Sequence, residues 1–239
     1  MVRRGSAALD HEALRMKNTA IVFARAPRLG TVKRRLAKDI GDRAALRFHI
    51  GTLLGLLRSL RADRTFRTVL AVTPDRARFR LSWRASPPAS SRRPDDAGGM
   101  AAAMRIPQGA GAIGARMDMA FRRFPRGNVL IVGCDIPAAN AADARKAFKA
   151  LGRADAVFGP AEDGGYWLVG MGPRRPACAF ANARWSSEHA LADTLANFAG
   201  RKIAFVRTLR DVDNVADLPI RPPTSPAPAR SSGDRANRR

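Results

Sequence analysis

The chain has 239 residues, 46% of them hydrophobic, and a formal net charge of +23. This length and apolar content suffice for one sizeable core, so we expect a single α/β domain at residues 18–218. A flexible N-terminal extension at 1–17 and a disordered basic tail at 219–239 would flank it. The charge makes a polyanion partner worth considering, but the arginines are dispersed and aromatic residues reach only 6%. A weak nucleic-acid contact by the tail is therefore the most we expect.

The cysteines and the N-terminus bear on the compartment. Cys134 and Cys178 form neither a disulfide framework nor a metal-binding spacing, and Cys134 is expected to be a small buried residue. The sequence has no apolar run of about 18 residues, which a membrane-spanning helix needs. Residues 1–16 lack the apolar segment of a signal peptide. We therefore expect a cytoplasmic protein without a membrane span.

The first predicted strand, at residues 19–24, runs into a basic loop at 23–36. Gly30 allows a turn, and Lys33 and Arg35 supply cations. Ligands of α/β sheets bind outside the carboxyl ends of strands, where this loop would lie. The loop therefore suits a phosphate, although a plain surface loop of an arginine-rich protein fits the same residues.

The middle of the chain alternates helices and strands. Periodic leucines predict a helix over 41–61 with Asp42 as N-cap, followed by a strand at 68–73. His49 has no acid or cysteine near it in the sequence, so we expect a helix-surface residue rather than a ligand. A stretch rich in Pro, Ser and Gly at 84–105 predicts a loop insert, and a Gly-rich turn then precedes a helix that reaches Phe124.

The second half of the domain offers carboxylates at strand ends. A wholly apolar strand at 128–134 ends in Asp135, which would point into the ligand crevice. A helix at 141–151 and a strand at 156–159 follow. The turn at 162–165 predicts a hairpin into a strand at 166–169. The last predicted elements are a helix at 190–198, capped by Ser186 or Ser187, and a strand at 202–206.

The order of these motifs is more specific than any one of them. The series APxxGxxKxRL, QGxGxxGxRM, GxDxP, PAEDGGYxLxG, WSS and DVDxxxDL resembles a bacterial family of GT-A-like glycosyltransferases of the arsenosugar-biosynthesis type. The resemblance spans residues 20–218 and implies a single-domain nucleotide-diphospho-sugar transferase fold. This is a Rossmann-like three-layer sandwich with a mostly parallel central sheet. The first loop is also similar to that of small guanylyltransferases related to molybdopterin-cofactor and phospholactate enzymes.

The resemblance implies roles for individual residues. The residues that match the nucleotide-binding loop are Arg25, Gly30, Lys33 and Arg35. Asp135 and Asp213 match positions that hold Mg²⁺ or Mn²⁺, with Asp211 as a second metal or sugar contact. Asp163 and Glu162 would be catalytic, with Asp163 as the acceptor base. The residues that match the acceptor side are Gly164, Gly165, Tyr166 and Trp185.

The implied activity is the metal-dependent transfer of a sugar from a nucleotide-diphospho-sugar to a small acceptor. Nucleotidyl transfer to a phosphorylated acceptor is an alternative, and so is a catalytically weak nucleotide- or nucleic-acid-binding relative. The chain also departs from the family pattern. Ala112 and Ala138 stand where the family commonly has Asp, so two carboxylates near the presumed metal or acceptor are missing.

Overall fold

An inner strand of the sheet is β1 (Asn18–Arg25), in which six consecutive residues are buried. It pairs in parallel with β2 (Arg67–Thr73) on one side and with β4 (Asn128–Gly133) on the other. The computed structural model describes residues 18–79 and 104–218. The expected N-terminal extension, the basic tail and most of the 84–105 insert lie outside the described residues.

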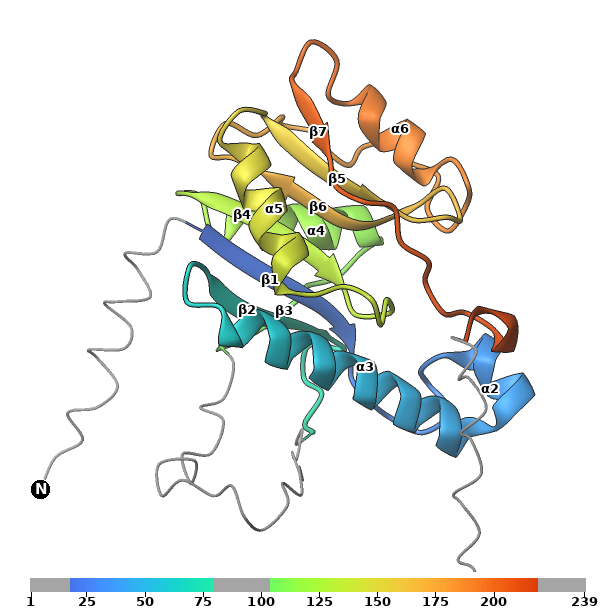
Figure 1. Cartoon of the computed structure of the whole chain (residues 1–239). Coiled ribbons are helices and arrows are strands. Elements are labelled where there is room, and N and C mark those ends of the chain that lie inside the picture. Colours follow the sequence, from blue (N-terminus) through green and yellow to red (C-terminus); the bar gives the residue numbers. More distant parts are fainter. Residues whose placement is uncertain (1–17, 80–103, 219–239) are drawn as a thin grey trace, which may run out of the picture.

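Seven strands form one mixed sheet in the order β3-β2-β1-β4-β6-β5-β7 (Figure 1). The remaining strands are β3 (Met104–Pro107), β5 (Ala156–Pro160), β6 (Tyr166–Met171) and β7 (Ile203–Phe205). Only β6 runs antiparallel to its neighbours, β4 and β5. The other four pairings are parallel, so the predicted mostly parallel sheet and the hairpin at 162–165 are both confirmed.

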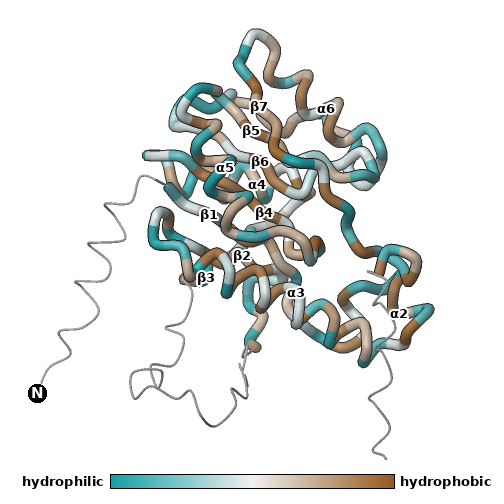
Figure 2. The backbone as a smooth tube through the Cα atoms, in the orientation of Figure 1, coloured by the Kyte–Doolittle hydropathy of each residue, from teal (hydrophilic) through white to brown (hydrophobic). Residues whose placement is uncertain are grey.

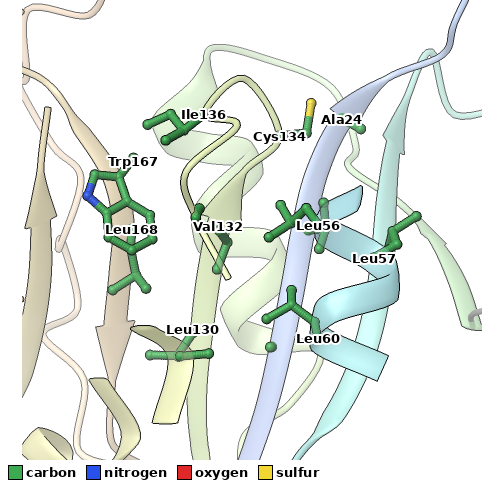
Figure 3. Packing of buried hydrophobic residues seen from close by; sticks show 14 of the residues in the cluster. Ala24, Leu56, Leu57, Leu60, Leu130, Val132, Cys134, Ile136, Trp167 and Leu168 are labelled. Atoms are coloured by element: carbon green, nitrogen blue, oxygen red, sulfur yellow. The ribbon is translucent and has the colours of Figure 1, made fainter. Parts of the chain in front are cut away.

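Helices cover both faces of the sheet (Figure 1). One face packs on α3 (Asp42–Ala62) and α5 (Ala141–Leu151), and the other on α4 (Ile113–Arg122) and α6 (Ala190–Ala196). Figure 2 shows hydrophobic residues along the central strands. Figure 3 shows leucines of α3 facing Leu130 and Val132 of β4. The expected three-layer sandwich is confirmed. In the described part of the chain no helix is long and apolar enough to cross a membrane, and the cytoplasmic location stays a prediction.

The edge strand β3 corrects the predicted end of the loop insert, which was expected to extend through Arg105. Met104 and Arg105 instead pair in parallel with Val69 and Leu70 of β2. Both residues are exposed and the strand has only four residues. A short edge strand needs a partner on one side only, so it lacks the continuous apolar run that marks a central strand.

The helix beginnings also differ from the prediction. Gly41, at φ +81°, is the N-cap of α3, and Asp42 lies in the first turn, where its charge still favours the helix dipole. The N-cap of α6 is His189 rather than a serine, although Ser187 Oγ accepts a bond from the His189 N–H at 3.3 Å. The short helix α2 (Arg34–Ile40) was not predicted, and it begins inside the expected basic loop.

Candidate functional site

A cleft opens where β1, β2, β3 and β4 end. It encloses about 530 Å³. The carboxyl ends of parallel strands meet at one edge of a sheet, which explains why separate motifs converge here. The charged side chains that line it are Arg25, Lys33, Arg34, Arg35, Arg116, Asp135 and Asp213. Five cations and two carboxylates give this cleft a positive field that suits a phosphorylated ligand.

Lys33 is the best enclosed of these cations, with a side chain that is 5% exposed. Its Nζ lies 3.1 Å from Asp135 Oδ1 and 3.4 Å from Asp213 Oδ1. The turn at Gly30 (φ +71°) and the left-handed conformation of Lys33 itself (φ 47°) direct the chain back toward the sheet. Arg35 donates to Asp213 Oδ2 at 3.0 Å. The structure thus brings Lys33, Arg35, Asp135 and Asp213 together, and their binding roles stay predictions.

Two residues of the Gly-rich motif reach the same cleft without having been assigned a role. The Gln108 side chain is buried, and its Nε2 donates to the carbonyls of Ala24 and Ala71 at 3.1 and 3.0 Å. Its Oε1 accepts from Arg116 at 3.0 Å, which fixes that guanidinium at the cleft. Burial, and then the charge of Arg25, lowers the pKa of Arg116. The sequence signal that could have pointed to these two residues is their position on either side of the glycines in the QGxGxxGxRM motif.

His49 contradicts its expected place on the helix surface, because it is only 3% exposed. It lies four residues after Ala45 and four before Leu53, both buried, so it belongs to the inner stripe of α3. Its Nε2 is 3.1 Å from the Arg25 carbonyl, and its Nδ1 is 3.9 Å from Asp135 Oδ1. The spacing to buried neighbours was the missed signal. The nearby acid, Asp135, follows the end of β4, far from His49 in the sequence.

Cys134 is buried, as predicted, but it follows β4 rather than lying within the strand, and it packs in the core beside Ala24 (Figure 3). Its Sγ is 4.0 Å from Asp135 Oδ1. Burial, followed by the charge of Asp135, raises the pKa of the Cys134 thiol.

A second cavity of about 250 Å³ adjoins the first, because both are lined by Ile113, Asp135 and Ser186. Its further polar and aromatic lining is Asp163, Tyr166, Trp167, Trp185 and Asp211. Of the predicted acceptor-side residues, Gly165, Tyr166 and Trp185 line this space with the predicted catalytic Asp163, whereas Gly164 is not in its lining. Burial, and then the charges of Asp213 and Asp163, raises the pKa of Asp211.

The β5–β6 turn is fixed by a close backbone approach. Gly164 adopts φ +83°, and a Cβ there would lie 2.2 Å from the carbonyl oxygen of Glu188. The Gly164 carbonyl accepts from the Leu191 N–H at 3.0 Å, which ties the turn to the start of α6. Asp163 Oδ1 accepts from the Gly165 N–H at 2.9 Å, which orients the carboxylate. Glycine is needed here because both the space and the backbone conformation exclude a side chain.

Two aromatic rings that line the second cavity, those of Tyr166 and Trp185, meet edge to face. The rings of Tyr166 and Trp185 are 6.3 Å apart at an interplanar angle of 71°. The Tyr166 hydroxyl accepts from Thr194 Oγ1 at 3.4 Å, and burial raises the pKa of this phenol. Such edge contacts add stability beyond the buried area and hold ring orientation.

Glu162 turns away from this second cavity. Its Oε2 accepts from Arg210 Nε at 2.6 Å. Both residues line a separate hollow of about 400 Å³ with Asp163, Asp211, Asp213 and Asp217. Among the described residues that surround the second cavity, Asp163 is present and Glu162 is not. Asp163 therefore faces both spaces, whereas Glu162 lines only the hollow.

Comparison with solved structures supports the fold. A protein of Desulfovibrio desulfuricans G20 classed as a nucleotide-diphospho-sugar transferase superposes with a TM-score of 0.70 and 25% identity over 84% of each chain. The 4-diphosphocytidyl-2C-methyl-D-erythritol synthase of Anaerococcus prevotii gives a TM-score of 0.50 at 11% identity, over 84% of this chain and 94% of the other. A search of the curated proteins finds no match.

The family comparison is more direct than these structural ones. The arsenosugar-biosynthesis type indicated by the motifs stays a prediction. The model of the family described as "Uncharacterized protein conserved in bacteria (DUF2064)" matches residues 56–187, more than half of the chain, so this protein belongs to the DUF2064 family.

Proposed function

We propose that this chain transfers a sugar from a nucleotide-diphospho-sugar to the hydroxyl of a small acceptor. The observation that carries the proposal is the pair of adjoining cavities, one rich in cations and one lined by aromatic rings and carboxylates, with Asp135 in both linings. The similarity to a protein classed as a nucleotide-diphospho-sugar transferase supports a transferase with a nucleotide donor.

In this proposal the first cavity binds the diphosphate. Lys33, Arg25 and Arg35 supply the charge, and the guanidinium forks pair with two phosphate oxygens at once. Arg116 joins them through its anchor on Gln108. Positioned cations that meet the negative charge as it develops on the departing diphosphate lower the barrier to transfer.

A divalent ion at Asp135 fits this donor set. The Asp135 carboxylate is 52% exposed toward the cleft, and Asp213 lies on the far side of Lys33 Nζ. Mg²⁺ and Mn²⁺ favour oxygen ligands, and Mg²⁺ commonly uses one or two carboxylates with the substrate phosphates. When bound, such an ion would neutralise the leaving diphosphate. Lys33 would then turn from the carboxylates to the phosphates.

The second cavity would hold the sugar and the acceptor. Tyr166 and Trp185 provide an apolar wall, and Gly164 and Gly165 let the turn approach closely. Asp163 accepts the proton of the acceptor hydroxyl while that oxygen bonds to the anomeric carbon and the carbon–phosphate oxygen bond breaks. Glu162 would act from the neighbouring hollow by holding Arg210.

Nucleotidyl transfer is a second candidate, and one observation favours it. A further cavity of about 330 Å³ adjoins the first and is lined by Arg25, Arg28 and Arg116, with no carboxylate among its described lining residues. Such a space suits the extra phosphate of a nucleoside triphosphate. The released product separates the two reactions, since glycosyl transfer releases a nucleotide and nucleotidyl transfer releases pyrophosphate.

The test is a thermal-shift panel of nucleotide sugars and nucleoside triphosphates, each with Mg²⁺ or Mn²⁺. We expect stabilisation of the wild type by at least one ligand, and its loss in Lys33→Ala and Asp135→Asn. Lys38→Ala is the matched control, since Lys38 is exposed on α2. No shift with any ligand would reject the transferase. Salt-sensitive nucleic-acid binding in its place would favour the binding-protein alternative.

A further inference from the structure

Beside the cleft, three possible ligand atoms of different chemistry gather around one point. His49, Cys134 and Asp135 each offer one such atom, and these atoms all lie within 4.8 Å of one another. All three residues line the first cavity. We propose that they bind a borderline-soft divalent ion of the Zn²⁺ or Co²⁺ class, with the fourth position open toward the cleft.

The orientation of His49 is that of a metal ligand. The Arg25 carbonyl can only accept, so the His49 Nε2 at 3.1 Å carries the proton and donates to it. The lone pair of Nδ1 then faces Asp135 Oδ1 at 3.9 Å. Metal-bound histidines characteristically donate their other ring N–H to a carbonyl or carboxylate. The unprotonated Nδ1 can then bind a cation beside the Asp135 carboxylate.

The distances fit a site that closes slightly on loading. Zn²⁺ takes nitrogen or oxygen ligands at about 2.0–2.1 Å and sulfur at about 2.3 Å, so tetrahedral ligand atoms lie roughly 3.3–3.6 Å apart. The Asp135 Oδ1 is 3.9 Å from His49 Nδ1 and 4.0 Å from Cys134 Sγ. The His49 and Cys134 ligand atoms lie within 4.8 Å of each other, so inward movements of roughly 0.5–1 Å would bring all three to bonding distance of one ion.

The chemistry of the donors selects the ion. A thiolate and an imidazole favour Zn²⁺ and Co²⁺, whereas a set of oxygens alone favours Mg²⁺ or Mn²⁺. Binding converts the Cys134 thiol to a thiolate, and its proton leaves to the solvent. Three protein ligands leave one position of a tetrahedral site for a water or a phosphate oxygen from the cleft.

Lys33 would compete with this ion. Its Nζ is 3.1 Å from the same Asp135 oxygen that faces His49 and Cys134. Removing the ammonium charge should therefore tighten metal binding, and a bound ion should free Lys33 for phosphate. This ion would occupy Asp135 in place of the Mg²⁺ or Mn²⁺ of the proposed function. The inference rests on the proposed function only for the use of Asp135 in transfer, and the binding itself can be measured without nucleotide.

The test is a Co²⁺ titration of the full, reduced chain without nucleotide. We expect one equivalent to bind, with the visible bands of four-coordinate Co²⁺ and a thiolate-to-cobalt band in the near ultraviolet. Cys134→Ser should lose the thiolate band. His49→Gln keeps a donor for the Arg25 carbonyl but lacks the ring nitrogen, and should weaken binding roughly tenfold or more. Lys33→Met should strengthen it.

The controls separate this site from its alternatives. Cys178→Ser removes the other, exposed thiol and should leave the spectrum unchanged. The far-ultraviolet circular dichroism of each variant checks that it is folded. A thiolate band that survives in Cys134→Ser would overturn the proposal. Co²⁺ binding that depends on Asp213 but not on His49 would indicate an oxygen-only site and would also overturn the proposal. Absence of any Co²⁺ binding would overturn it as well. A loaded protein that binds no nucleotide sugar would instead count against the proposed function.

Discussion

The basic half of the cleft, formed by the residues that line the 530 and 330 Å³ cavities, contrasts with the acidic half, formed by those that line the 250 and 400 Å³ cavities. In the basic half, buried polar side chains bond to sheet carbonyls, as Gln108 and His49 do. In the acidic half, a glycine turn and aromatic edges set the shape. The difference suggests that the basic half carries donor binding and the acidic half carries transfer.

The largest expected effect is on catalysis in the acidic half. Asp163→Asn should lower the transfer rate about 10²- to 10⁴-fold, because the acceptor loses its base while the amide oxygen can still accept from the Gly165 N–H. Donor binding, measured by thermal shift, should be unchanged. The adjacent Glu162→Gln is the matched control with a much smaller effect, because it loses only an exposed pair with Arg210. A loss of donor binding in Asp163→Asn would show that the acidic half also binds the donor, and would contradict the division of roles between the two halves.

A large effect on stability is expected at the turn of the acidic half. Gly164→Ala should cost roughly 2–4 kcal/mol in the free energy of unfolding, because left-handed strain adds to overpacking against Glu188. Gly200→Ala is the matched control, since Gly200 has φ +73° but no atom within 4 Å of a built Cβ. It should cost about 1–2 kcal/mol. Urea unfolding measures both, and equal costs would mean that the close approach is unimportant.

The basic half should respond to its buried amide. Gln108→Leu leaves the carbonyls of Ala24 and Ala71 without their side-chain donor and frees Arg116, at a cost of about 1–3 kcal/mol. The affinity for the nucleotide donor should also fall, because the Arg116 guanidinium loses its hydrogen bond to Gln108 Oε1. Calorimetric titration of the nucleotide ligand found by thermal shift measures this. An unchanged affinity would show that Arg116 plays no part in donor binding.

The smallest effect concerns the pH dependence of the acidic half. Because burial and the charges of Asp213 and Asp163 raise the pKa of Asp211, the ionised carboxylate costs folding free energy above that raised pKa. The cost disappears as the pH falls below the ordinary value of 3.8. Asp211→Asn should therefore unfold at a higher temperature than the wild type at neutral pH, with the difference shrinking in acid. A lower Tm at neutral pH would contradict it.

Local patterns were enough to predict most of the elements. Apolar runs marked β1, β2 and β4, and the Asp-Gly-Gly turn marked the β5–β6 hairpin, because burial on both faces and glycine conformations are set by short stretches. The edge strand β3 and the short helix α2 were not predicted, because neither contains an apolar run or a helical hydrophobic period long enough to be recognised. The placement of Asp135 at a strand end was also predictable from sequence.

The sequence by itself determined which residues could meet phosphate and where the strands end. Only the tertiary structure decided which partners they face. Lys33 lies between two carboxylates that follow it by more than a hundred residues, and His49 meets Cys134 and Asp135 across the boundary between α3 and β4. Such contacts depend on the order of strands in the sheet, and strand order is fixed by long-range packing that no local pattern encodes.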